Sequence, residues 1–283
     1  MKAARSAKVL AVDLDGTLLD HFGNPHARDL RALHEAKRAG IAVSILTGRL
    51  YSGTRAAAVA ASIDGPVGCA DGSHIVRVAD SSTLVHHGLA GVGAHRLREA
   101  VNESRPATFL FANDRIVHDS GGHDYLTYLS TWSQELEHTD AIHDHDVWDL
   151  PNGITAVVCV GTSEQIHAVA HAVNAEARES VQVAAFPIRK LDQWGLVARA
   201  AGGTKGTALR WLAEHHGCTV EETVCVGDWL NDVPMFRAAG RSFAMGHAPA
   251  EVKDVATDVL LETSEIGGGV ATAIDRAFGI RVR

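Results

Sequence analysis

The chain has 283 residues, of which 46% are hydrophobic and 21% are charged. This length and composition suit one large globular domain or two ordinary ones, and they exclude wholesale disorder. A formal net charge of −8 argues against nucleic acid or an anionic lipid surface as the main partner. The apolar runs stay well short of the roughly 20 residues that a membrane-spanning helix needs.

The N-terminal residues are basic, but the apolar segment that follows them carries Asp13 and Asp15. The hydrophobic region of a signal peptide would not contain these acids. The chain has no Cys-x-x-Cys pair, and its cysteines lie among apolar or strand-like residues, at Cys69, Cys159, Cys218 and Cys225. We therefore expect buried free thiols and a protein of the reducing cytoplasm.

The first 75 residues alternate between strand and helix patterns. Short apolar runs predict strands at 9–12, 41–46 and 67–70. Asn24-Pro25 predicts the start of a helix that Gly40 ends, and alanine-rich residues predict a second helix at 54–61. This order implies a parallel sheet with helices on its faces. It places residues 13–17 and 47–49 at carboxyl ends of strands, where open α/β sheets bind ligands.

The middle of the chain has a different pattern of short strands and helices. Its predicted strands are 75–78, 83–86, 108–111, 116–118, 154–160 and 181–186. Helices are predicted at 93–104, 122–137 and 163–178, and residues 138–153 read as a loop. We expect an α+β cap domain over residues 77–191, inserted into a core domain made of residues 1–76 and 192–283.

The α/β pattern resumes after the insertion. Helices are predicted at 205–216, 231–239 and 249–255, and strands at 223–226, 242–244 and 258–261. The expected fold class is therefore α/β, with a doubly wound, mostly parallel sheet and an inserted α+β cap domain.

Carboxylates follow two of the predicted core strands. Asp13 and Asp15 stand two residues apart where the chain turns at Gly16, and Asp228 follows the strand at 223–226. Close carboxylates repel one another, and burial makes their ionisation harder still. A divalent cation relieves both effects, and a set of oxygen ligands favours Mg²⁺. We predict a magnesium site formed by Asp13, Asp15 and Asp228.

These residue types suit phosphoryl transfer, which needs positioning and neutralisation of charge. Asp13 is the candidate nucleophile, and Asp15 is the candidate acid and base. Thr47 can donate its hydroxyl to a phosphoryl oxygen, and Lys205 supplies a fixed positive charge. Each short motif is common as a turn or a helix cap when it stands alone. The conjunction of all of them in order favours a catalytic site.

The same segments give the chain a family resemblance. It resembles the haloacid dehalogenase (HAD) superfamily, in particular phosphatases of the Cof type, which have a large α/β cap. The motifs that carry the resemblance are Asp13-Leu14-Asp15-Gly16-Thr17-Leu18, Thr47-Gly48-Arg49, Lys205-Gly206 and Gly227-Asp228-Trp229-Leu230-Asn231-Asp232. The resemblance spans the whole chain, and it is closer in the core than in the cap.

The resemblance implies roles for further residues. Asp13 is implied as nucleophile and metal ligand, and Asp15 as acid and base with its backbone carbonyl on Mg²⁺. Asp228 is an implied metal ligand. Gly48, Asn231 and Asp232 are implied to contact phosphate or to support the metal from outside its ligand set. Two residues depart from the pattern, because Trp229 and His247 stand where the branch commonly has Asn.

The implied activity is Mg²⁺-dependent hydrolysis of a small phosphorylated metabolite, such as a sugar phosphate, through an aspartyl-phosphate. A phosphomutase would keep the same core residues and stays open. A phosphate-binding regulatory protein also stays open, although Asp15 and the large insertion disfavour it. Arg189 and Lys190 are candidate substrate contacts from the cap. The run His143–Asp146 more often marks solvated surface than a metal site.

Overall fold

The structure is a computed structural model that describes residues 7–188 and 192–282. The chain divides into two compact units. One, here called the core unit, contains Met1–Gly48, Arg55–Leu84 and Thr204–Arg283. The other, here called the cap unit, contains Arg49–Thr54 and Val85–Gly203. None of the helices in the described ranges has the length and apolar character needed to cross a lipid bilayer.

The core unit is built on a parallel sheet with strand order β14-β13-β12-β1-β2. Its strands are β1 (Val9–Val12), β2 (Ala42–Ile45), β12 (Thr223–Gly227), β13 (Arg241–Ala244) and β14 (Asp258–Val259). The central strands β1 and β12 are fully buried, and Thr223 is their one polar residue, as expected for parallel strands covered on both faces. The predicted parallel α/β core is confirmed.

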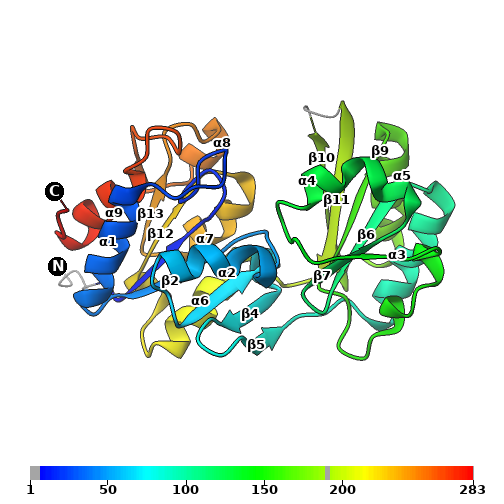
Figure 1. Cartoon of the computed structure of the whole chain (residues 1–283), viewed down its shortest axis with the longest axis horizontal. Helices are drawn as coiled ribbons and strands as arrows, with labels where there is room; N and C mark the ends of the chain where they lie inside the picture. Colours follow the sequence, from blue (N-terminus) through cyan, green and yellow to red (C-terminus); the bar gives the residue numbers. More distant parts are fainter. Residues whose placement is uncertain (1–6, 189–191, 283) are drawn as a thin grey trace. The chain divides into compact units, whose positions relative to one another are not determined.

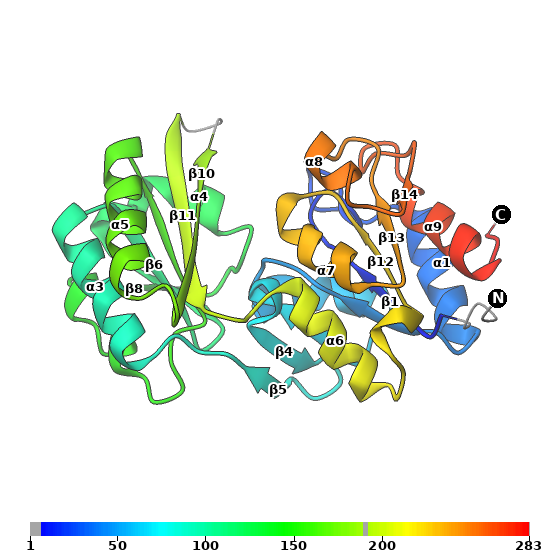
Figure 2. The ribbon, with the colours of Figure 1, turned by 180° about the vertical axis from the view of Figure 1, so that it is seen from behind.

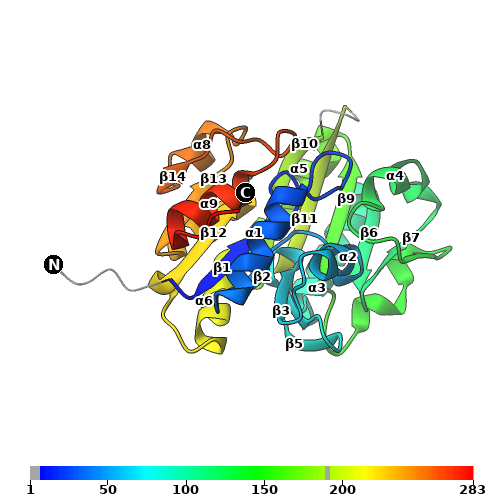
Figure 3. The same ribbon diagram turned by 60° about the vertical axis from the view of Figure 1, so that its left-hand side comes forward.

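Helices cover both faces of this sheet. Those in contact with it are α1 (Ala27–Arg38), α6 (Lys205–His215), α7 (Val233–Ala238) and α9 (Gly269–Phe278). The core unit also contains α8 (Ala250–Lys253) and most of α2 (Tyr51–Ala60), whose first residues belong to the cap unit. α6 and α7 lie in front of the sheet in Figure 2, and α1 and α9 lie in front of it in Figure 3. The core unit is therefore doubly wound, as the sequence predicts.

The first helix starts later than expected. Asn24 is not its cap, because the carboxylate of Asp20 accepts hydrogen bonds from the backbone N–H groups of Phe22 and Asn24 and closes a turn there. Pro25 forms an isolated β-bridge with Leu19, so α1 begins after His26, whose ring accepts from the N–H of Arg28.

The predicted third parallel strand is largely antiparallel. β3 (Pro66–Cys69) pairs with β4 (His74–Arg77), and β5 (Ser82–His86) completes a sheet of order β3-β4-β5. In the part of the chain that the structure describes, β3 is joined to the end of β2 by an isolated parallel bridge between Leu46 and Gly68. The reason is the tight turn after β3, where Ala70 and Asp71 have φ of 46° and 53° and send the chain back alongside itself.

The cap unit contains a sheet of order β10-β11-β9-β6-β7-β8. Its strands are β6 (Ala107–Ala112), β7 (Arg115–His118), β8 (Leu136–His138), β9 (Ala156–Gly161), β10 (Val181–Ile188) and β11 (Gln193–Ala200). Its helices α3 (Gly91–Ser104) and α5 (Ser163–Glu176) cover one face, and the short α4 (Leu126–Leu129) lies on the other (Figure 1). Alternate residues of β6 and β9 feed the two hydrophobic cores on these faces.

Three elements were not expected from the sequence: β8, β11 and α9. The predicted helix over 122–137 is wrong, since it contains only α4, a short 3-10 helix and the start of β8. The predicted loop at 138–153 is confirmed, with two short 3-10 helices in it. Pro187 lies inside β10, which is an edge strand and tolerates a residue without an N–H.

The cysteines are free thiols, as expected. Cys69, Cys159 and Cys225 are buried, whereas Cys218 is half-buried. Burial raises the pKa of the Cys159 thiol to about 12, which keeps it protonated and unreactive.

One ion pair links strands β13 and β14 at the edge of the core sheet. The guanidinium of Arg241 donates from Nε and Nη2 to the two carboxylate oxygens of Asp258, over 2.9 and 3.1 Å. The hydrogen bond from Arg241 lowers the pKa of Asp258, so the pair stabilises the fold above the ordinary Asp value of about 3.9. That contribution is lost as the pH falls through the lowered value.

Asp258→Asn is expected to reduce the free energy of unfolding by at most about 1 kcal/mol at pH 7, because the pair is partly exposed. Urea unfolding of both proteins at pH 7 and at pH 3 measures the difference, which should shrink at the lower pH. A difference that stays equal at both pH values would contradict the assignment.

Candidate active site

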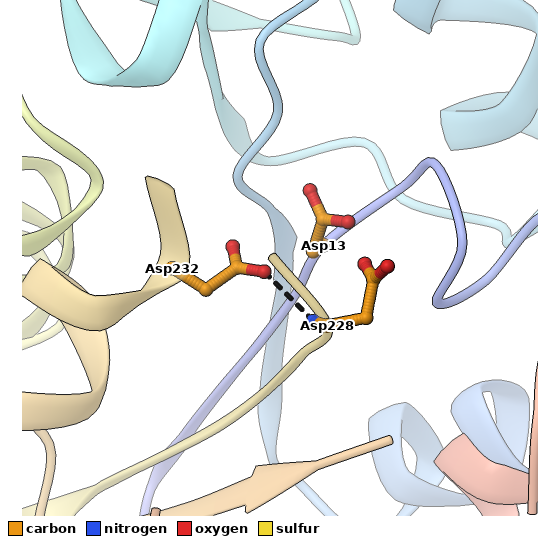
Figure 4. Close-up of side chains that lie close together, drawn as sticks. All are labelled: Asp13, Asp228 and Asp232. Atoms are coloured by element: carbon orange, nitrogen blue, oxygen red, sulfur yellow. Dashed lines mark hydrogen bonds between the residues drawn. The ribbon is translucent and has the colours of Figure 1, made fainter. Parts of the chain in front are cut away.

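Polar side chains gather at the carboxyl edge of the core sheet. Asp13 directly follows β1, Thr47 follows β2, Asp228 follows β12, and Lys205 is the first residue of α6. Figure 4 shows the carboxylates of Asp13, Asp228 and Asp232 close to one another. Because the strands are parallel, their carboxyl ends meet at one edge, and this brings together residues that are more than 200 positions apart.

Lys205 lies at the centre of the site. Its side chain is completely buried, and its Nζ donates to Oδ1 of Asp13 over 2.5 Å and to Oδ1 of Asp232 over 2.6 Å. Burial lowers the pKa of Lys205, but the charges of Asp13, Asp232 and Asp71 outweigh burial and raise the pKa above its ordinary value. The lysine is therefore a permanent positive charge inside the site.

Asp232 has both carboxylate oxygens occupied. Oδ1 accepts from Lys205, and Oδ2 accepts from the backbone N–H groups of Asp228 and Trp229 over 2.8 and 2.9 Å. The dashed line in Figure 4 marks the bond to Asp228. Asp232 thus holds the ammonium group of Lys205 and the backbone at Asp228 in fixed positions.

Asp228 is held by two side chains. The hydroxyl of Thr17 donates to its Oδ1 over 3.0 Å, and Nε2 of His247 lies 3.2 Å from its Oδ2. Gly16 passes against the same carboxylate with a φ of +80°, and a Cβ there would lie 2.5 Å from Oδ2. A residue without a side chain is therefore required at the turn between Asp15 and Thr17.

Thr47 and Asn231 lie beside Asp71, which is not among the predicted catalytic or metal-binding residues. Thr47 is fully buried, and its backbone carbonyl accepts from the N–H of Asp71 over 2.8 Å. The buried carboxylate of Asp71 accepts from Nδ2 of Asn231 over 2.7 Å, and a Cβ on Gly48 would lie 3.4 Å from it. The only sequence signal for Asp71 is an acid before glycine at a strand end.

Asp15 differs from its neighbours because its side chain is exposed. Its backbone forms an isolated bridge with Leu19, which keeps the loop after β1 compact. An exposed carboxyl group next to a buried one suits exchange of a proton with substrate and water. Its carboxylate is not one of the clustered three.

The acidic side chains of the site outnumber its buried lysine. Among the described residues, the carboxylate oxygens of Asp13, Asp228 and Asp232 form the one group of possible ligands within 4.8 Å of one another. Burial raises the pKa of Asp13 well above its ordinary value against the opposing effect of Lys205, and Asp232 and Asp228 raise it further. Three acids with one lysine leave an excess negative charge that a divalent oxygen-binding cation would neutralise.

Two further predictions concern residues of the cap. Arg189 and Lys190 lie outside the described residues. In the run His143–Asp146, Nδ1 of His145 accepts from the N–H of Val147 over 3.2 Å. Neither histidine of that run belongs to the clustered ligand group found in the described part of the chain.

Comparison with known proteins assigns the chain to a class of enzyme. A sequence model for haloacid dehalogenase-like hydrolases matches residues 10–274, which is nearly the whole chain. The chain belongs to this family, and the resemblance drawn from its motifs, including that to the Cof branch, is confirmed. Its curated relatives are phosphatases, and it is an enzyme of that type.

Two relatives align along almost their full length. Pyridoxal phosphate phosphatase YbhA of Escherichia coli is 27% identical over 266 residues, which cover 90% of this chain and 93% of the relative. The 5-amino-6-(5-phospho-D-ribitylamino)uracil phosphatase YcsE of Bacillus subtilis is 27% identical and covers 94% of each chain. A haloacid dehalogenase-like hydrolase from Bacteroides thetaiotaomicron, 23% identical, has the same fold, with a TM-score of 0.82 over 96% of this chain and 100% of its own.

Proposed function

We propose that this phosphatase is Mg²⁺-dependent and hydrolyses a small phosphorylated metabolite through an aspartyl-phosphate on Asp13. The observation that carries the proposal is the excess of buried negative charge around Lys205. The carboxylates of Asp13 and Asp228 end two adjacent strands, and one lysine cannot neutralise them together with Asp232. Such a site favours a divalent cation and, with it, an anionic substrate.

The residues present fit a magnesium ion. The carboxylates of Asp13 and Asp228 and the backbone carbonyl of Asp15 are the proposed ligands. Asp232 is assigned a supporting role, because it accepts three hydrogen bonds, from Lys205 and from the backbone N–H groups of Asp228 and Trp229. When bound, the ion supplies positive charge against the phosphoryl oxygens. Lys205 adds the second positive charge, and Thr47 and Asn231 contribute donors, with Gly48 leaving space for the phosphoryl group.

The proposed reaction has two displacement steps at phosphorus. The carboxylate of Asp13 attacks, the bond from phosphorus to the ester oxygen breaks, and Asp15 gives its proton to the departing alcohol. Asp15 then takes a proton from water, whose oxygen attacks the phosphorus of the acyl phosphate. Inorganic phosphate leaves, and the carboxylate of Asp13 is restored. Lys205 holds Asp13 in place throughout.

The substrate class rests on the relatives and on one exposed side chain. The YbhA relative is named for pyridoxal phosphate, and the YcsE relative is named for a phosphorylated ribitylaminouracil. Each of these compounds contains a flat ring. Trp229 directly follows Asp228 and is 58% exposed, which offers an apolar surface to such a ring. Pyridoxal phosphate is therefore the first compound to test, before sugar phosphates. Contacts from Arg189 and Lys190 remain predictions.

Removal and return of metal tests the proposal. Dialysis against EDTA is expected to abolish phosphate release from p-nitrophenyl phosphate, and Mg²⁺ is expected to restore it. Ca²⁺ should bind without restoring activity, because its larger and looser coordination shell suits the site poorly. Full activity in EDTA would overturn the proposal. Stoichiometric phosphorylation without turnover would support the regulatory alternative, and transfer to a second hydroxyl would support a phosphomutase.

A further inference from the structure

His247 contacts the carboxylate of the proposed metal ligand Asp228. Its Nε2 lies 3.2 Å from Oδ2 of Asp228, while Thr17 donates to Oδ1. Because an ionised carboxylate only accepts, the imidazole must carry its proton on Nε2. Two donors on opposite oxygens fix the rotation of the carboxylate, whose side chain is only 10% exposed.

The loop that carries His247 is itself firmly anchored. The N–H of Met245 donates to the carbonyl of Gly227, at the end of the strand that presents Asp228, over 2.9 Å. Gly246 donates to the carbonyl of Glu262, and its own carbonyl accepts from Nζ of Lys253. A Cβ on Gly246 would lie 2.6 Å from the carbonyl oxygen of Leu261, so the loop fits closely here. The anchored backbone of this loop therefore places His247 within reach of Asp228.

We propose that His247 is a positioning residue that holds Asp228 in the orientation needed to bind a divalent cation. This inference rests on the proposed metal site. His247 does not join the clustered ligand atoms found among the described residues, so it acts through Asp228. Hydrogen-bond partners of this kind orient metal ligands, and their loss typically reduces metal affinity about 10–100-fold.

The length of the side chain gives the inference a sharp test. The amide nitrogen of glutamine reaches about as far from the backbone as Nε2 of histidine, whereas that of asparagine is one bond shorter. His247→Gln should therefore keep the bond to Asp228, and His247→Ala should lose it. His34→Ala is the matched control, since His34 is an exposed histidine on α1 in the same unit.

The measurement is binding of Mn²⁺, which shares the oxygen preference of Mg²⁺ and is counted by electron paramagnetic resonance of the free ion. We expect the dissociation constant to rise about 10-fold or more in His247→Ala and to stay within about threefold of wild type in His247→Gln and His34→Ala. The Mg²⁺ concentration for half-maximal activity should rise in parallel, with kcat nearly unchanged at saturating Mg²⁺. Melting temperatures in EDTA should match, which excludes a general folding defect.

Wild-type affinity in His247→Ala, or equally weak binding in His247→Gln and His247→Ala, would overturn the inference. Failure of the proposed function has a different signature, since Mn²⁺ binding is measured without substrate. A protein that binds Mn²⁺ in a His247-dependent manner but releases no phosphate would keep the inference and lose the function. A wild-type protein that binds no Mn²⁺ overturns both.

Discussion

Asp13→Asn is expected to reduce phosphatase turnover at least roughly 10⁴-fold, the scale of loss when a nucleophile is removed. An amide oxygen is a poor nucleophile, and its neutral group also weakens the proposed metal site. The expected loss is in kcat, because Thr47, Lys205 and Asn231 remain available to bind the phosphoryl group. Steady-state kinetics with p-nitrophenyl phosphate and trapping of a phosphorylated chain measure both effects.

The same substitution should leave the fold intact. Burial raises the pKa of Asp13, which means that its charged form is disfavoured in the folded state, and Lys205 keeps Asp232 as a partner after the change. The melting temperature in EDTA should therefore be equal to or above that of wild type. Asp254→Asn, an exposed residue beyond α8, is the control and should retain full activity. An active Asp13→Asn protein would remove Asp13 from the role of nucleophile.

Lys205→Met is expected to reduce the free energy of unfolding by about 3–5 kcal/mol in EDTA. The lysine is fully buried between two carboxylates, and its removal leaves buried negative charges without a partner. Activity should be lost as well, and Mg²⁺ should recover part of the stability by neutralising Asp13 and Asp228. Urea unfolding with and without Mg²⁺ measures these changes.

A second variant shows whether charge is the cause. In Lys205→Met with Asp232→Asn, the amide oxygen at position 232 can still accept from the backbone of Asp228 and Trp229, while one unpaired charge disappears. The double variant should be more stable than Lys205→Met alone. Lys37→Met is the control, because its pair with Asp64 is exposed and is worth less than about 1 kcal/mol. If Lys37→Met and Lys205→Met reduced the free energy of unfolding equally, the stabilising role assigned to the buried charge of Lys205 would be wrong.

The sequence predicted the core unit better than the cap unit for a physical reason. Buried parallel strands such as β1 and β12 appear as short, mainly apolar runs, and they match their predicted positions closely. The edge strand β8 has three residues and no pattern, and β11 contains Gly195 with little alternation. Helix α9 begins in a run of glycines, and its start is fixed by Asp29 of α1, which accepts from the N–H groups of Gly268 and Ala271. Because Asp29 is distant in the sequence, the residues around the start of α9 do not indicate this cap.

The grouping of the candidate site was also predictable, because a parallel sheet brings strand ends to one edge. Asp13, Lys205 and Asp228 meet there as expected. What the pattern missed were contacts that depend on exact side-chain positions. The occupation of both oxygens of Asp232, the bond from Asn231 to Asp71 and the contact of His247 with Asp228 follow only from the folded backbone. The catalytic roles of these residues remain proposals.

The central place of β1 in the sheet affects how the chain is made. β1 pairs with β12 on one side and with β2 on the other, and Asp13 and Lys205 are 192 positions apart. During synthesis, β1 therefore emerges from the ribosome long before β12, and the backbone N–H and C=O groups along one of its edges stay unpaired until then. Lys205 can contact Asp13 only after most of the chain has been translated. The active site can therefore form only late in folding, and enzymatic activity indicates that the core sheet is complete.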